Sequence, residues 1–113
     1  MKKRDVVFYK HYFNEFYLAQ AEKVRKKIVQ TLIWLQTIDV LPVSILRSIK
    51  GTKGLYEIRI EFGGDIFRVF CCFDKQAIVV LFNGFQKKSN KTPNKEIEKA
   101  ERLMKEYFSC KNS

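Results

Sequence analysis

Apolar positions along the chain follow a helical spacing first and a strand spacing later. Between residues 12 and 38 they recur every three or four positions, at Phe13, Phe16, Tyr17, Val24, Ile28, Leu32, Leu35 and Ile38. This spacing predicts a helical region, which can be interrupted near residues 18–20. The region ends between Asp39 and Pro42, because the residue before a proline avoids the α conformation.

From Leu55 the period changes to two, and apolar residues alternate with Glu57, Arg59 and Glu61. This alternation predicts a half-buried strand over residues 55–62, and Gly63-Gly64 then predicts a tight hairpin. A second strand over residues 65–73, a turn at 74–76 and a third strand from 77 to about 85 complete the predicted meander.

Polar residues 86–94 are expected to form a loop before a last helix. Thr92 is predicted to cap that helix, with Pro93 at its first position. Its apolar face comprises Ile97, Ala100, Met104 and Tyr107. The expected fold class is therefore α+β: N-terminal helices, an antiparallel meander and a C-terminal helix, in one domain over residues 1–113.

A two-residue turn at Gly63-Gly64 fixes the register of the first hairpin. It pairs Ile60 with Phe67, Ile58 with Val69 and Tyr56 with Cys71, so that one face of the hairpin is apolar and packs on the helices.

The same register places Arg59 directly opposite Arg68 on the other face. Opposed like charges are unfavourable. Two explanations stand open: Glu57 and Glu61 neutralise the arginines, or the two guanidinium groups converge on an anion such as phosphate.

The third strand extends this basic face. With a tight second turn, Leu81, Asn83 and Phe85 are expected beside Phe70, Arg68 and Ile66. No acidic residue occurs in residues 86–95, which contain Lys87, Lys88, Lys91 and Lys95. A lysine run is commonly a solvated loop. Next to Arg59, Arg68 and an exposed Phe85 that could stack on a base, however, it indicates an RNA-binding cleft, which Lys50 and Lys53 could close from another side.

Composition agrees with a polyanionic partner. The 113 residues include 22 Lys and Arg against 12 Asp and Glu, a net charge of +10. Such an excess favours nucleic acid first and an anionic membrane second. No apolar run is long enough to cross a bilayer and no secretion signal is apparent, so we expect a cytoplasmic protein without a membrane role.

The residue inventory restricts the chemistry. Cys71 and Cys72 are adjacent, Cys110 is the third cysteine, and His11 is the one histidine. A zinc site, a serine triad and a Cys–His pair are therefore disfavoured. We expect no metal and no cofactor, three reduced structural cysteines, and an ordinary surface role for His11.

Four segments in order also resemble a known family. They are residues 50–59 (KGTKGLYEIR), 66–70 (IFRVF), 81–88 (LFNGFQKK) and 91–100, where KTP is followed by EIEKA. Over roughly residues 5–108 the chain resembles the RelE/ParE toxin superfamily, most closely its HigB-like, phage-derived branch. The resemblance implies a small antiparallel sheet with two N-terminal helices and a C-terminal helix. It also implies the toxin of a type II toxin–antitoxin pair.

The implied activity is ribosome-dependent cleavage of mRNA by the RNA's own 2′-hydroxyl. The implied partner is a helix-turn-helix antitoxin, in a toxin–antitoxin hetero-oligomer. By motif position, Arg59 and Arg68 would stabilise the phosphate, and Lys88 or Lys87 would be the acid or a second clamp. Glu57 stands where such clefts place a further lysine, and it could act as a base or orient Arg59. No tyrosine matches their late catalytic one, because Tyr107 lies too far along the last helix. The general base is thus unassigned.

The expected binding residues complete this hypothesis: Lys50, Lys53, Asn83, Phe85, Lys87 and Lys91. Two other functions remain open. A ParE-like toxin would bind DNA gyrase, an action that needs no opposed arginines, and a plain nucleic-acid-binding module would carry out no chemistry. A membrane-surface role fits least, because the basic residues lie on a sheet and loops instead of one amphipathic helix.

Overall fold

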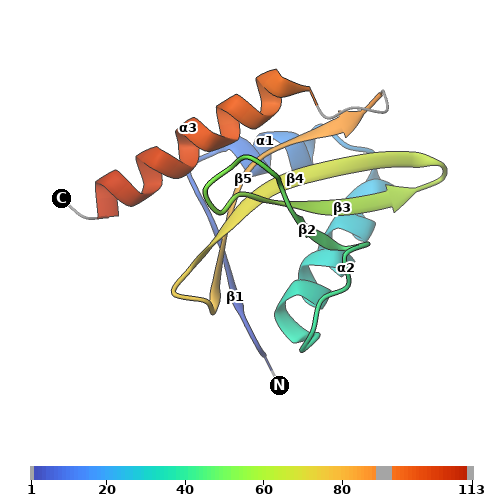
Figure 1. Cartoon of the computed structure of the whole chain (residues 1–113). Helices are drawn as coiled ribbons and strands as arrows, with labels where there is room; N and C mark the ends of the chain where they lie inside the picture. Colours follow the sequence, from blue (N-terminus) through green and yellow to red (C-terminus); the bar gives the residue numbers. More distant parts are fainter. Residues whose placement is uncertain (1, 89–92, 112–113) are drawn as a thin grey trace.

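The computed structural model describes residues 2–88 and 93–111. A five-stranded sheet of order β1-β5-β4-β3-β2 forms its centre, and α1 and α2 pack on one face while α3 crosses the other (Figure 1). The elements are β1 (Asp5–Phe8), α1 (Tyr12–Leu18), α2 (Glu22–Thr37), β2 (Leu46–Ser48), β3 (Tyr56–Phe62), β4 (Asp65–Asp74), β5 (Ile78–Lys87) and α3 (Asn94–Lys111). The predicted α+β class with two N-terminal helices and one C-terminal helix is confirmed.

The interruption that the sequence allowed near residues 18–20 is present, since α1 ends at Leu18 and Ala21 is extended before α2. Other predicted elements need adjustment. The apolar N-terminal segment forms β1, which pairs in parallel with β5, and β2 adds an edge strand beside β3. β5 continues to Lys87, so that Gln86 and Lys87 belong to a strand and not to the expected loop. The predicted cap, Thr92, lies outside the described residues.

Two apolar clusters lie on opposite faces of the sheet. One joins α1 and α2 to the apolar face of the first hairpin, as the alternation predicted: Phe13, Phe16, Ile28, Leu35, Ile58, Ile60, Phe67 and Val69 are among its members. The other joins α3 to the opposite face and includes Leu55, Phe70, Cys72, Val80, Phe82, Ala100 and Leu103. Burying a large aliphatic or aromatic side chain contributes about 1.5–3 kcal/mol, so both helix layers are held mainly by apolar burial.

The register of β3 and β4 is the predicted one, with Arg59 opposite Arg68. The predicted register of β4 and β5 is wrong. Phe85, not Asn83, lies beside Arg68, and Lys87 lies beside Ile66. The turn is one residue longer than expected, because Lys75 and Gln76 adopt positive φ and Asp74 pairs with Ile78.

The register beyond Phe70 differs from the predicted one by two residues. The longer turn accounts for one of them, and a β-bulge in β5 accounts for the other. Phe82 and Asn83 together oppose Phe70, because the neighbouring pairs are Val69 with Gly84 and Cys71 with Leu81. The bulge turns Asn83 towards α3 and Gly84 towards α1. A Cβ at Gly84 would lie 2.7 Å from the Phe16 ring, so glycine permits this close approach.

Polar contacts fix both ends of α3. Near its start, the Asn83 amide donates to the Glu96 carbonyl oxygen at 3.3 Å and to Glu96 Oε1 at 3.1 Å. Near its end, the Tyr107 hydroxyl donates to the buried Asp74 carboxylate at 2.7 Å, and Lys111 Nζ lies 2.7 and 2.8 Å from the two Asp74 oxygens. This carboxylate raises the pKa of Tyr107 to about 12. Within the described ranges, no helix has the length and hydrophobicity needed to span a membrane.

The Asp74 anchor generates a pH-dependent prediction. Hydrogen bonds from Lys111 and Tyr107 lower the pKa of Asp74 below its ordinary 3.8. Ionised Asp74 therefore stabilises the fold fully above the unfolded-state value, and this contribution is lost as the pH falls through the folded-state pKa. We expect Asp74→Asn to lower the Tm at neutral pH, and to lower it progressively less below about pH 4. Circular dichroism melts across this range measure the effect. Asp65→Asn, at the exposed β3–β4 hairpin, is the control, and a Tm difference that does not change with pH would contradict the prediction.

Candidate functional site

The candidate site lies on the face of the sheet that α3 partly covers. Cross-strand pairing determines its composition, because Arg47 of β2 lies opposite Glu57 of β3, and Arg59 of β3 lies opposite Arg68 of β4. Phe85 of β5 continues the second row beyond Arg68. Three arginines and one glutamate from three adjacent strands therefore lie on one face.

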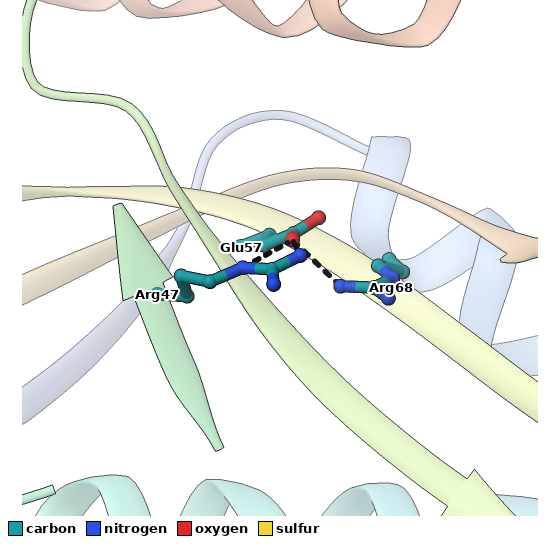
Figure 2. A network of polar contacts seen from close by, with 3 residues as sticks. All are labelled: Arg47, Glu57 and Arg68. Carbon is teal, nitrogen blue, oxygen red and sulfur yellow. Dashed lines mark hydrogen bonds and ion pairs between the residues drawn. The ribbon is translucent and has the colours of Figure 1, made fainter. Parts of the chain in front are cut away.

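Glu57 is the centre of this group. Its side chain is only 4% exposed, and its Oε1 atom accepts hydrogen bonds from Arg68 Nη1 at 2.6 Å, Arg47 Nη2 at 2.5 Å and Arg47 Nε at 3.2 Å. Figure 2 shows the two guanidinium groups meeting at this one oxygen from opposite sides. Bonds between charged groups are about twice as strong as neutral ones, so Glu57 fixes the position of both arginines.

Two buried polar atoms of the same pair are not satisfied. Among the described residues, neither Glu57 Oε2 nor Arg68 Nε has a hydrogen-bond partner. The second Glu57 oxygen points away from both guanidinium groups in Figure 2. Buried polar groups in folded proteins are nearly always hydrogen-bonded, so two such atoms in one ion pair call for an explanation, and a role in ligand binding is one.

A cleft of about 320 Å³ opens beside the arginines. It is lined by Val43, Ser44, Arg47, Glu57, Arg59 and Arg68. The Arg59 side chain is one-third exposed and contacts Glu61 Oε2 at 3.3 Å. With Lys87 nearby, four cations face two carboxylates, so the group carries an excess charge of +2 at neutral pH. A multivalent anion such as phosphate is the ligand that this charge favours.

The cations at the site destabilise one another. Burial is the main cause that lowers the pKa of Arg68; Glu57 opposes this shift, and Arg47 and Arg59 add to it. Burial also lowers the pKa of Lys87, followed by the charge of Arg68. Arginine nonetheless stays protonated at any physiological pH. An anion placed among these groups would relieve their mutual repulsion.

The structure brings together four of the residues that the sequence singled out. Glu57, Arg59 and Arg68 line the same cleft, and Lys87 interacts electrostatically with all three. Both explanations of the opposed arginines have structural counterparts, because each arginine contacts one carboxylate and both still line the cleft. Of the two roles that the sequence left open for Glu57, orientation of Arg59 is not supported, because Glu57 bonds to Arg47 and Arg68 while Arg59 bonds to Glu61.

The remaining predicted residues are dispersed. Asn83 is buried under α3, and Phe85 is half-buried and stacked on Phe70 with ring centroids 5.6 Å apart; the expectation of an exposed Phe85 is wrong because β5 is shifted by two residues. Lys50 lines a neighbouring cavity. Lys53 and Lys88 are exposed and do not line the cleft. Lys91 lies outside the described residues.

Arg47 was not predicted from the sequence. It belongs to a strand of three residues, which is too short to show a period of two. The signal that could have indicated a further cation is Glu57, a glutamate on a strand of the predicted sheet, because a buried carboxylate needs charged partners. The sequence does not say which residue supplies it.

Comparison with protein families now defines the class of protein. The family of phage-derived Gp49-like proteins (DUF891) matches residues 15–105, which is most of the chain. The chain therefore belongs to the Gp49-like family, a RelE-like family of toxin–antitoxin toxins, and this membership implies an antitoxin partner. No curated protein shows significant similarity to the chain.

The central role of Glu57 can be tested by comparing it with Glu61 on the same strand. Glu57→Gln removes the charge between two guanidinium groups, one of them buried, and should lower the free energy of unfolding by about 3–5 kcal/mol. Glu61→Gln breaks an exposed pair and should cost less than about 1 kcal/mol. Urea denaturation measures both. Equal effects of the two substitutions would contradict a structural role specific to Glu57.

Proposed function

We propose that this Gp49-like toxin is a ribosome-dependent mRNA endonuclease of the RelE and HigB type. The observation that carries the proposal is the group of Arg47, Arg59, Arg68 and Lys87 around one buried glutamate beside an open cleft. Four cations on a rigid sheet suit a reaction whose main requirement is stabilisation of negative charge on phosphorus.

The proposed reaction needs no external reactant. The 2′-oxygen of one ribose attacks the adjacent phosphorus, the bond from phosphorus to the 5′-oxygen breaks, and a 2′,3′-cyclic phosphate remains. The proton of the 2′-hydroxyl leaves with a base, and the departing 5′-oxygen takes up a proton from an acid. Arg59 and Arg68, joined by Arg47, would bind the phosphate and the doubly charged phosphorane, because all three line the cleft.

Lys87 is the better candidate for the acid. It lies on β5 beside Ile66, two residues from Phe85 and therefore on the same face as Arg68. Burial and the neighbouring Arg68 charge lower the pKa of Lys87, so it gives up a proton more readily than an ordinary lysine. Lys88 follows the end of the strand and is exposed.

Glu57 is proposed to position the arginines. One of its oxygens already accepts bonds from Arg47 and Arg68, and the other is buried. A base must reach the proton that it removes, and a buried oxygen does not meet that condition. Glu57 thus holds Arg47 and Arg68 in fixed orientations and reduces the repulsion between them.

The proposed partners follow from the family and the charge. The mRNA on the ribosome is the substrate, and exposed Lys50 and Lys53 at the turn between β2 and β3 extend the basic surface towards it. The antitoxin is proposed to be a helix-turn-helix protein that covers the arginine face in a toxin–antitoxin complex. Cleavage of mRNA on the ribosome and binding of the antitoxin would both take place in the cytoplasm, which is therefore the proposed location.

Primer extension on cellular mRNA after brief induction tests this function. Wild-type protein should produce discrete cuts within translated regions and arrest growth. Arg59→Ala should abolish both while leaving the fold intact, because Arg59 is partly exposed and pairs only with exposed Glu61 among the described residues. Arg102→Ala, on the exposed side of α3, is the matched control and should behave as wild type. Growth arrest without cuts would instead favour a DNA gyrase target.

Substitutions of the neighbouring Lys87 and Lys88 distinguish a proton donor from a lysine that only adds positive charge to the surface. Lys87→Ala should reduce the cleavage rate by about 10²–10⁴-fold, whereas Lys88→Ala should change it only a few-fold. Lys87→Arg keeps the charge but cannot release a proton, so it should retain RNA affinity and still lose rate. Single-turnover cleavage on programmed ribosomes measures these rates. A larger loss in Lys88→Ala than in Lys87→Ala would exclude the assignment.

A further inference from the structure

A second cavity adjoins the arginine cleft. It has a volume of about 360 Å³ and is lined by Arg47, Ser48, Ile49, Lys50, Glu57 and Ile97. Arg47 and Glu57 line both cavities, so their ion pair forms a shared wall. A ligand that extends from the cleft past this pair would enter the second cavity.

The two cavities differ in chemical character. The cleft is lined by four charged residues with one valine and one serine. In the second cavity, Ile49 of the β2–β3 loop and Ile97 of α3 provide apolar surface, and both also pack against the apolar cluster beneath α3. Ser48 and Lys50 supply polar groups at the rim. A flat apolar ligand with polar edges, joined to an anion, matches this pair of cavities.

Hydrogen bonds to the preceding residue hold Ile97 in position. It follows Glu96, whose backbone and side chain both accept bonds from the buried Asn83 amide. Asn83 faces α3 because of the bulge in β5. In the β2–β3 loop, the Thr52 hydroxyl donates to the Ile49 carbonyl oxygen at 2.7 Å, and the Ile49 amide donates to the Leu55 carbonyl oxygen at 3.0 Å. Both apolar walls are therefore built before any ligand arrives.

We propose that this second cavity binds the nucleobase of a nucleotide adjoining the scissile phosphate. The base packs its face on Ile49 and Ile97 and directs its edge to Ser48, while the phosphate lies across the Arg47–Glu57 wall among the arginines. This inference rests on the proposed endonuclease function and adds to it a subsite that determines base preference. Apolar side chains commonly hold bases that have been taken out of a stack.

Direct binding tests the subsite without catalysis. Nucleoside 3′-monophosphates are titrated into the isotope-labelled protein, and ribose 5-phosphate, which has a phosphate but no base, is the matched ligand. The methyl signals of Ile49 and Ile97 should move with the nucleotides and not with ribose phosphate. The methyl signals of Ile33, on the exposed side of α2, should not move with either. Equal shifts of Ile49 and Ile97 with both ligands, or none with either, would overturn the inference.

The rate of cleavage of a modified mRNA supplies the second test. An mRNA with an abasic nucleotide next to the cut site should be cleaved about tenfold more slowly by wild type, as expected for one lost stacking contact. Ile97→Ala should cleave the normal mRNA correspondingly more slowly and show little further loss with the abasic one; Ile33→Ala should behave as wild type. If wild type cuts mRNA but Ile97→Ala keeps the full abasic effect, the subsite is wrong and the function stands. If wild type cuts no mRNA, the proposed function fails, and the methyl titration alone decides whether the cavity binds a base.

Discussion

The buried carboxylate of Glu57 is the feature on which the rest of the site depends. One oxygen of this group accepts bonds from both Arg47 and Arg68, which come from strands on either side of β3. Without that charge, the buried Arg68 guanidinium would face the repulsion of Arg47 and Arg59 without a compensating carboxylate. The glutamate therefore permits several arginines to lie together on one face of the sheet, and with Arg47 it forms the wall between the two cavities.

The bulge in β5 connects this site to α3, which covers part of the same face of the sheet. It turns Asn83 towards α3, where the amide donates to Glu96 and holds the beginning of the helix beside the second cavity. It also shifts the strand so that Phe85 lies beside Arg68 and Lys87 beside Ile66. A local irregularity of one residue thus decides which lysine accompanies the arginines and where Ile97 is placed.

Local sequence rules predicted much of the fold and part of the site. The spacing of apolar residues identified the helical regions and three strands of the meander, and Gly63-Gly64 fixed the first hairpin, because a two-residue turn leaves only one register. The opposition of Arg59 and Arg68 followed directly. The β4–β5 register was not predictable in the same way, since two positive-φ residues lengthen a turn that contains no glycine.

The sequence by itself determined the excess of positive charge, the apolar face of the first hairpin and the paired arginines, because these depend on composition, period and one tight turn. Only the tertiary structure decided that Arg47 completes the site, that Glu57 binds Arg68 instead of Arg59, and that Lys87 lies on the same face as Arg68. Each of these depends on contacts between segments far apart in the chain. The cations that pair with the Glu57 carboxylate are determined when the strands assemble into the sheet. An unpaired charge becomes costly only when it is buried, and assembly of the sheet is the step that buries Glu57.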